Sequence, residues 1–382
     1  MLYDPAQFER PTEEPWNPGR VEAAIAEIVA DADVAFDPDS LWPAHEWDGW
    51  QAALPMKNLY VGAAGVIWAL AALRPHSESR LDLAAAAVRA LECWRAEPDF
   101  TKGEPIPALA GAAPFYGETG PLLVSLLLAP DATRADRLHE LVLANRDNES
   151  NEPFAGAPGT LLAAAAMRDA SGEGRWAEAA DETADALAAR RGEDGLWTQH
   201  LWGQEFKALG ASHGAVANVR ALLHVDAPRN DALRRETGEL LARHARRENG
   251  FANWTDQPRL QWCVGAPGIL IAAWDYLDEE LLLAGAELIW AAGAHGDEKG
   301  HGICHGTSGN GFALLKAFAR TGDELWLERA RRFAVHALAQ AERIAAANGR
   351  RRYSLFTGDV GTALFAAACL DGDARYPVFD RL

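Results

Sequence analysis

The sequence has few cysteines and few basic residues for its length. Of 382 residues, 4 are cysteine, and 36 Lys and Arg stand against 55 Asp and Glu, for a formal net charge of −19. Four cysteines are too few for a disulfide framework, which indicates reduced thiols. The excess of negative charge argues against a nucleic-acid-binding surface and against binding to an anionic membrane face, because both would repel the chain.

Long apolar runs are missing as well. The longest uncharged apolar stretch, Leu59–Leu73, is shorter than the roughly 20 residues that span a bilayer. The first 17 residues contain four acidic residues instead of the basic start and apolar run of a signal peptide. We therefore expect a cytoplasmic protein with no membrane span.

Glycine, in contrast, is abundant and recurs at regular intervals. A Gly-x-x-Gly pair, or in one case Gly-x-x-Ala, is followed by a run of Ala and Leu seven times. The first glycines of these pairs are Gly62, Gly117, Gly156, Gly214, Gly265, Gly306 and Gly358. Their mean spacing of about 49 residues accommodates two helices of roughly 15 residues with their connections.

Two kinds of helix are predicted to alternate. Amphipathic segments lie between the glycine pairs, at 20–33, 80–95, 134–145, 175–190, 229–247, 279–292 and 323–347, and apolar segments follow each pair. This pattern predicts an all-α fold, an (α/α)7 double-ring toroid of seven outer and seven inner helices, as a single domain over residues 1–382. An open α-solenoid of stacked helix pairs is the alternative. We favour the closed ring, because glycine pairs allow close backbone approach.

Potential metal ligands stand directly before two of the glycine pairs. Cys263 precedes Gly265, and Cys304 and His305 precede Gly306. Thiolate and imidazole are donors that Zn²⁺ prefers, and three protein ligands leave a fourth position for water or substrate. The alternative is two buried cysteines that pack as small apolar residues beside a hydrogen-bonded histidine.

Five further residues stand at corresponding positions, on one rim if the inner helices run parallel. His213 is a candidate general acid, or a histidine that caps an inner helix. Glu152 is a candidate to orient His213 or to take a proton. Arg259 is a candidate donor to an enolate or carboxylate, and Lys299 to a leaving phosphate, although both can be surface residues. Trp262 is expected to form a wall beside the metal.

These segments together resemble the signature motifs of the lanthionine synthetase C-like (LanC-like) family. The matching residues are His213-Gly214, residues 262–268 (Trp-Cys-Val-Gly-Ala-Pro-Gly) and residues 304–309 (Cys-His-Gly-Thr-Ser-Gly). The seven glycine pairs and the ending, residues 353–356 and 375–377, also follow the family, so the resemblance covers essentially the whole chain.

The resemblance implies a sevenfold double α-toroid with a zinc ion held by Cys263, Cys304 and His305. In lanthipeptide cyclases of the family, zinc binds a peptide cysteine thiolate, which adds to a dehydroalanine or dehydrobutyrine to form a thioether. In the branch related to the eukaryotic LanC-like proteins, the thiol is glutathione and the acceptor is left by phosphate elimination. The resemblance also assigns the proton transfer to His213.

Two motifs are similar to the second branch rather than to the cyclases. Residues 151–156 read Asn-Glu-x-x-x-Gly, where cyclases carry Asp, and residues 299–304 read Lys-Gly-x-Gly-x-Cys. Thr357 departs from this branch, which has Glu there. The arginine that this branch has in a Pro-Asp segment is also missing, and the run Arg350-Arg351-Arg352 stands there instead. We assign the binding of the thiol substrate to Arg351 of this run and to Trp262.

The sequence therefore predicts a zinc enzyme that forms C–S bonds. It would add glutathione or a peptide cysteine to a dehydroamino acid of a peptide or protein, and whether it also eliminates phosphate is left open. A lanthipeptide cyclase and a non-catalytic module that binds zinc, glutathione or a protein are the alternatives. A prenyltransferase or glycosidase built on a similar toroid is disfavoured, because neither an Asp ligand nor paired rim carboxylates are evident.

Overall fold

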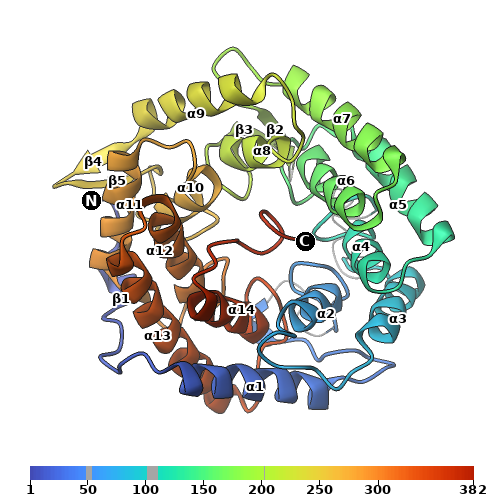
Figure 1. Cartoon of the computed structure of the whole chain (residues 1–382), viewed down its shortest axis with the longest axis horizontal. Coiled ribbons are helices and arrows are strands. Elements are labelled where there is room, and N and C mark those ends of the chain that lie inside the picture. Colours follow the sequence, from blue (N-terminus) through green and yellow to red (C-terminus); the bar gives the residue numbers. More distant parts are fainter. Residues whose placement is uncertain (49–53, 101–110, 202) are drawn as a thin grey trace. The chain divides into compact units, whose positions relative to one another are not determined.

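The computed structural model of the chain describes residues 1–48, 54–100, 111–201 and 203–382. Within these residues the chain forms fourteen α-helices, short 3-10 helices at Pro5–Gln7 and Glu46–Asp48, and six short strands. Helices therefore dominate the fold (Figure 1).

The two predicted kinds of helix alternate along the chain. The amphipathic helices are α1 (Pro18–Ala35), α3 (Leu83–Ala96), α5 (Ala132–Asn145), α7 (Gly174–Ala189), α9 (Asn230–His244), α11 (Glu279–Ala292) and α13 (Glu324–Asn348). The helices that follow the glycine pairs are α2 (Ala63–Ala72), α4 (Thr119–Leu128), α6 (Ala157–Ser171), α8 (Ala215–Leu222), α10 (Ala266–Ala273), α12 (Thr307–Thr321) and α14 (Asp359–Asp371). All residues of α10 are buried, whereas α1 buries only one stripe. The predicted alternation is confirmed.

Contacts group the chain into two compact units. Unit 1 comprises residues 1–35, 69–80 and 238–376, and unit 2 comprises residues 36–68, 81–237 and 377–382. Within unit 1, α12 packs against the inner helices α10 and α14 and the amphipathic helices α11 and α13 (Figure 1). Within unit 2, α6 packs in the same way against α4, α8, α5 and α7. The prediction of a single domain over 1–382 stays a prediction.

Three short antiparallel strand pairs interrupt the helical pattern. The sequence did not predict these strands. They are β1 (Phe8–Glu9) with β6 (Ala294–His295), β2 (Thr198–Leu201) with β3 (Gln204–Lys207), and β4 (Arg246–Glu248) with β5 (Phe251–Asn253). Alternation of polar and apolar residues is recognisable only over about four to eight residues. Strands of two to four residues therefore leave little trace in the sequence.

The glycine pairs allow the loop before an inner helix to fold over the first helical turn. A Cβ atom on Gly159, Gly309 or Gly361 would overlap the backbone carbonyl oxygen six residues earlier, that of Pro153, Ile303 or Leu355. Because the obstacle is backbone, it cannot swing aside as a side chain would. At these three positions the second glycine is thus required by packing, whereas the fourth repeat has Ala217 at the corresponding position.

Gly361→Ala should therefore lower the free energy of unfolding by about 1–3 kcal/mol, the usual cost of overpacking a filled site. Gly174→Ala is the matched control, because an added Cβ there meets nothing within 4 Å. That change should leave stability unchanged or raise it by about 0.5–1 kcal/mol, since alanine restricts the unfolded chain. Chemical denaturation of both variants measures the difference, and equal stabilities would contradict the packing argument.

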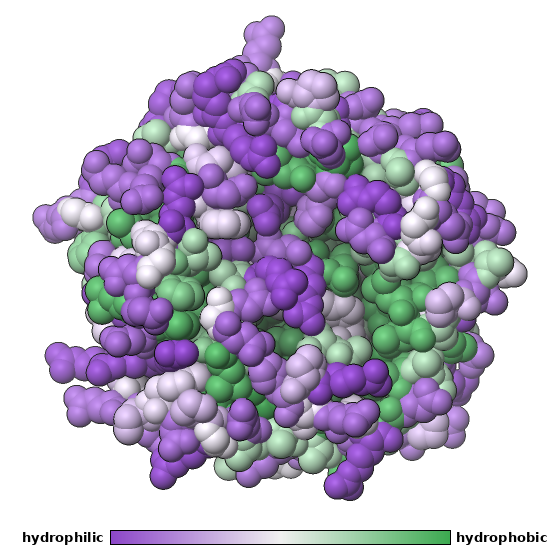
Figure 2. All heavy atoms as spheres, in the orientation of Figure 1, coloured by the Kyte–Doolittle hydropathy of each residue, from purple (hydrophilic) through white to green (hydrophobic). Residues whose placement is uncertain are grey.

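Hydrophilic residues make up most of the surface drawn in Figure 2, and apolar residues gather in smaller patches. Across the part of the chain that the structure describes, no helix combines the length and apolar character needed to cross a bilayer. This agrees with the absence of a long apolar run in the sequence.

Candidate functional site

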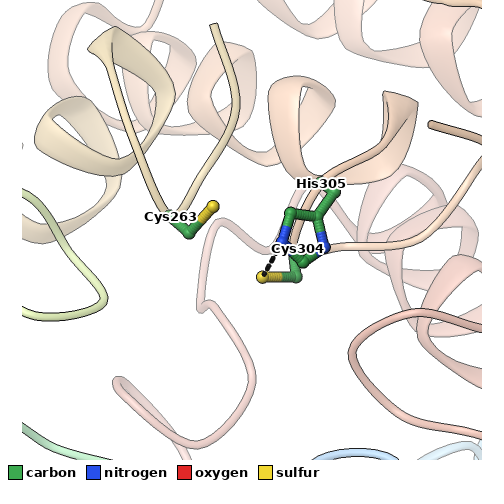
Figure 3. Close-up of side chains that lie close together, drawn as sticks. All are labelled: Cys263, Cys304 and His305. Carbon is green, nitrogen blue, oxygen red and sulfur yellow. Dashed lines mark hydrogen bonds between the residues drawn. The ribbon is translucent and has the colours of Figure 1, made fainter. Parts of the chain in front are cut away.

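Two thiols and an imidazole come together in unit 1 from two loops that are distant in the sequence. Cys263 lies in the loop before α10, and Cys304 and His305 lie in the loop before α12. One ligand atom from each of the three side chains lies within 4.8 Å of the other two (Figure 3). The Sγ atom of Cys304 is 3.7 Å from Nε2 of His305. The structure thus gathers the three residues that the sequence predicted as metal ligands.

This group fits a zinc ion. Zn–S bonds of about 2.3 Å and Zn–N bonds of about 2.0–2.1 Å in tetrahedral geometry place ligand atoms roughly 3.5–3.8 Å apart, close to the Cys304–His305 separation. Cys304 is buried, with 1% of its surface exposed, whereas Cys263 and His305 are half-buried. Two of the three residues are therefore partly exposed to solvent, as is expected of a zinc site that keeps a position open.

The surroundings of Cys263 favour the thiolate form of its side chain. The pKa of Cys263 lies well below its ordinary value, mainly because of hydrogen bonding with the Cys304 side chain. His305 and Gln261 lower this pKa further, whereas burial acts in the opposite direction. The side-chain Nε2 of Gln261 donates to the Cys263 sulfur at 2.8 Å. Since the thiolate is the form that binds metal, Gln261 supports the proposed ligand.

Residues that the sequence did not single out hold the Cys263 loop in place. Asn253 donates from Nδ2 to the Arg259 carbonyl at 3.0 Å, and its Oδ1 accepts from the Ala266 N–H at 2.7 Å. It thereby ties together both ends of the segment that contains Cys263. No sequence motif marks Asn253, because its partners are set by the fold of β5 against this loop.

A buried histidine supports the middle of the same loop. Nε2 of His295 lies 3.0 Å from the Leu260 carbonyl oxygen, which also accepts from Nδ2 of Asn310 at 3.1 Å. Burial is the main cause that lowers the pKa of His295 to about 3, and the nearby Lys299 and His305 act in the same direction. His295 is therefore neutral at physiological pH, and its Nε2–H can donate to Leu260.

Aromatic rings join the two ligand-bearing loops. The Trp262 ring stacks on Tyr376 with centroids 5.3 Å apart, and it lies 5.6 Å from Phe356. Tyr376 donates from its hydroxyl to the Ile303 carbonyl at 2.9 Å, and the Cys304 N–H donates to Phe356 at 2.8 Å. Trp262 is 1% exposed. The structure thus places Trp262 in the core, and its proposed substrate contact stays a prediction.

The three basic residues predicted for substrate binding differ in their surroundings. Arg259 is exposed and Lys299 is half-buried. Arg351 is buried and paired with Asp359 at 2.9 Å and with Glu342. Their roles toward a substrate stay predictions, and Arg259 is the most accessible of the three.

In unit 2, the structure brings His213 and Glu152 together. The Nδ1 atom of His213 lies 2.7 Å from a carboxylate oxygen of Glu152, which is fully buried. An ionised carboxylate only accepts, so Nδ1 carries a proton and donates it. Glu152 also accepts from the backbone N–H groups of Phe154 at 3.0 Å and Ala155 at 2.6 Å. The pair is therefore a histidine whose orientation is set by a rigidly held acid.

Comparisons with known proteins agree with the motifs. The family described as lanthionine synthetase C-like protein matches residues 56–381. Over 131 residues the chain is 34% identical to the glutathione S-transferase LANCL1 of Danio rerio. The aligned stretch covers 32% of this chain and 31% of that protein. The chain thus aligns with only about a third of the length of this curated relative.

The structure is similar to that of a nisin cyclase, with a TM-score of 0.58 over 91% of this chain and 94% of that chain. At 16% sequence identity, this likeness speaks for the fold alone. Together with the alternating helices, it confirms the predicted all-α fold class, the (α/α)7 toroid.

Proposed function

The chain belongs to the lanthionine synthetase C-like family, and from this premise we propose that it is a zinc-dependent enzyme that adds a thiol to a dehydroamino acid. The thiol is glutathione or a peptide cysteine, and the acceptor is dehydroalanine or dehydrobutyrine in a peptide or protein. The observation that carries the proposal is the convergence of Cys263, Cys304 and His305 within 4.8 Å. These are soft donors in the number that a catalytic zinc site uses.

Cys263, Cys304 and His305 would hold the zinc ion. When bound, zinc makes a coordinated thiol a thiolate at neutral pH, a form that a free thiol of pKa about 8.5 reaches only in small part. Gln261 stabilises negative charge on Cys263 through its hydrogen bond. Cys263 and His305 are partly exposed, and a thiol substrate would approach the zinc ion from their side.

We assign the proton transfer to His213. Attack of the thiolate sulfur on the β-carbon forms a C–S bond, breaks the C=C π bond and leaves the electron pair on the α-carbon as an enolate. A proton delivered to the α-carbon completes the thioether. His213 is suited to this delivery because imidazole is a common general acid and Glu152 fixes the orientation of the ring.

Basic residues of unit 1 would receive the charged groups of the substrates. Arg259 is exposed and can meet a carboxylate or the enolate, as a bidentate donor. Arg351 is already paired with Asp359 and Glu342, so its role as a glutathione anchor requires exchange of those partners. Lys299 would balance the charge of a phosphate if the chain also eliminates phosphate to make the acceptor.

Glutathione is the thiol that the relatives favour. The glutathione S-transferase LANCL1 is named for this thiol, and the Asn151-Glu152 and Lys299-to-Cys304 motifs resemble that branch. The similarity to nisin cyclase concerns the fold alone and does not favour a peptide cysteine as the thiol. A peptide cysteine is therefore the second choice.

The test is thiol addition by the full chain, followed by mass spectrometry. The zinc-loaded protein is incubated with a dehydroalanine peptide and glutathione, and separately with a peptide that carries both dehydroalanine and cysteine. The proposal predicts a peptide mass increased by one glutathione. Ring closure without a glutathione adduct would assign a cyclase, and glutathione binding without turnover would assign a binding module. No thioether with either thiol would contradict the proposed enzyme.

A further inference from the structure

The first residues of the chain wrap around the supports of the Cys263 loop. We call residues 2–12 the N-terminal arm. The arm belongs to the same compact unit as Cys263, Cys304 and His305, and it lies outside the residues matched by the family, 56–381. The support that the arm gives to the proposed metal-binding loops therefore comes from residues outside the matched region.

The start of the arm contacts Asn253, which ties together the two ends of the Cys263 loop, and Pro258, which precedes Arg259 in that loop. Besides its bond to Arg259, the side-chain amide of Asn253 donates to the Leu2 carbonyl at 2.8 Å. The Asp4 N–H donates to the Pro258 carbonyl at 3.3 Å. Leu2 itself is buried. The arm thus fixes the orientation of the amide that ties residues 259 and 266 together.

The middle of the arm contacts the second support, His295. Strand β1 pairs with β6, so that Phe8 lies opposite His295. Their ring centroids are 4.5 Å apart with an interplanar angle of 34°. Since His295 contacts the Leu260 carbonyl three residues before Cys263, Phe8 covers the face of the ring that supports the loop.

The end of the arm is fastened to α13. Glu9 accepts from Nε2 of His336 at 2.9 Å and from Arg343 at 3.1 Å, and the Thr12 N–H donates to Nδ1 of His336 at 3.2 Å. Because α13 packs against α12, which begins just after His305, this attachment holds the arm on the same scaffold as the second ligand-bearing loop.

We propose that the N-terminal arm is a positioning element for the metal site, acting through Asn253 and His295 on the loop that carries Cys263. The contacts that carry the proposal are with Asn253 and His295, which support the loop, so the expected effect is on how well the ligands are pre-arranged. Loss of the arm leaves the ligands present but lets the Cys263 loop shift, which weakens metal binding. This inference rests on the proposed zinc site.

The test compares two matched phenylalanine variants of the full chain. Phe8→Ala removes the ring that covers His295. Phe36→Ala is the control, because Phe36 is also half-buried and packs on an aromatic ring, Trp42, at 4.8 Å, but belongs to unit 2. Zinc affinity is measured by competition with a chromophoric chelator, at a temperature where circular dichroism shows both variants folded. The absorption of bound Co²⁺ reports thiolate coordination independently of activity.

Phe8→Ala is expected to bind zinc about tenfold more weakly or worse, the usual effect of disturbing residues that support metal ligands, with altered Co²⁺ absorption. Phe36→Ala should stay within about twofold, and Phe8→Tyr, which keeps the ring, should recover most of the affinity. Deletion of residues 2–12 should weaken binding further. Wild-type affinity in Phe8→Ala, or an equal loss in Phe36→Ala, would overturn the proposal. A wild-type chain that binds no zinc would instead refute the metal site itself.

Discussion

Replacing Cys304 by alanine should abolish stoichiometric zinc and slow thiol addition by about a thousandfold or more. Cys304 is the most buried of the three proposed ligands, so no water or neighbouring side chain readily substitutes for its sulfur. The rate estimate follows from the several kcal/mol that a catalytic metal contributes, at 1.36 kcal/mol for each factor of ten. Metal analysis of the purified variant and the rate of glutathione adduct formation measure both effects.

Cys369→Ala is the matched control for that variant. Cys369 is also buried in unit 1, on α14, and burial raises the pKa of its thiol above the ordinary value. It does not belong to the group of Cys263, Cys304 and His305. This variant should retain zinc and activity even if it is somewhat less stable. Retention of zinc and of full activity in Cys304→Ala would show that the group binds no catalytic metal.

His213→Ala should reduce turnover by about 10²–10⁴-fold, the range of a general acid, while zinc content stays unchanged. The expected loss is in kcat, because the imidazole delivers a proton and does not hold the thiol. Steady-state kinetics together with metal analysis separate this variant from the loss of a ligand. Unchanged turnover would remove His213 from the mechanism and leave its contact with Glu152 a structural one.

Glu152→Gln probes the partner of the same histidine. The amide keeps one oxygen that can accept from Nδ1 of His213, but it replaces a charge-assisted hydrogen bond by a weaker neutral one. We expect a smaller loss of turnover than in His213→Ala. Alanine is a poor choice here, because Glu152 is fully buried and accepts from the backbone of Phe154 and Ala155.

The alternation of helices was predictable because it leaves a regular signal in the sequence. Each glycine pair marks the start of an inner helix, and each charged segment marks an amphipathic one. The metal group was predictable for the same reason, since Cys263 and Cys304 stand at the same offset from Gly265 and Gly306. Equal offsets from equivalent helices place side chains at equivalent heights, and the structure brings these two thiols together.

The supporting residues were not predictable, because their partners are distant in the sequence. Gln261 stands next to the ligands but is one polar residue among many until its distance to Cys263 is known. His295 contacts Leu260, 35 residues away, and Asn253 contacts Leu2, 251 residues away. No local pattern encodes such pairs.

Asn151 shows how one motif serves both structure and the proposed chemistry. Its side chain donates to the Thr198 carbonyl at 2.8 Å and accepts from Arg190 at 2.7 Å. These bonds fasten the loop that presents Glu152 to β2 and to the end of α7. The sequence motif Asn-Glu therefore contains one residue that holds the loop and one that orients His213.

The central claim is that zinc held by this chain activates the thiol, and zinc titration of the metal-free protein tests it most directly. The full chain is stripped with a chelator, and the rate of glutathione addition to a dehydroalanine peptide is followed by mass spectrometry as zinc is returned. The rate should be negligible without zinc, rise in proportion to added zinc, and level off at one ion per chain. Adduct formation at the full rate by the stripped protein would contradict the account.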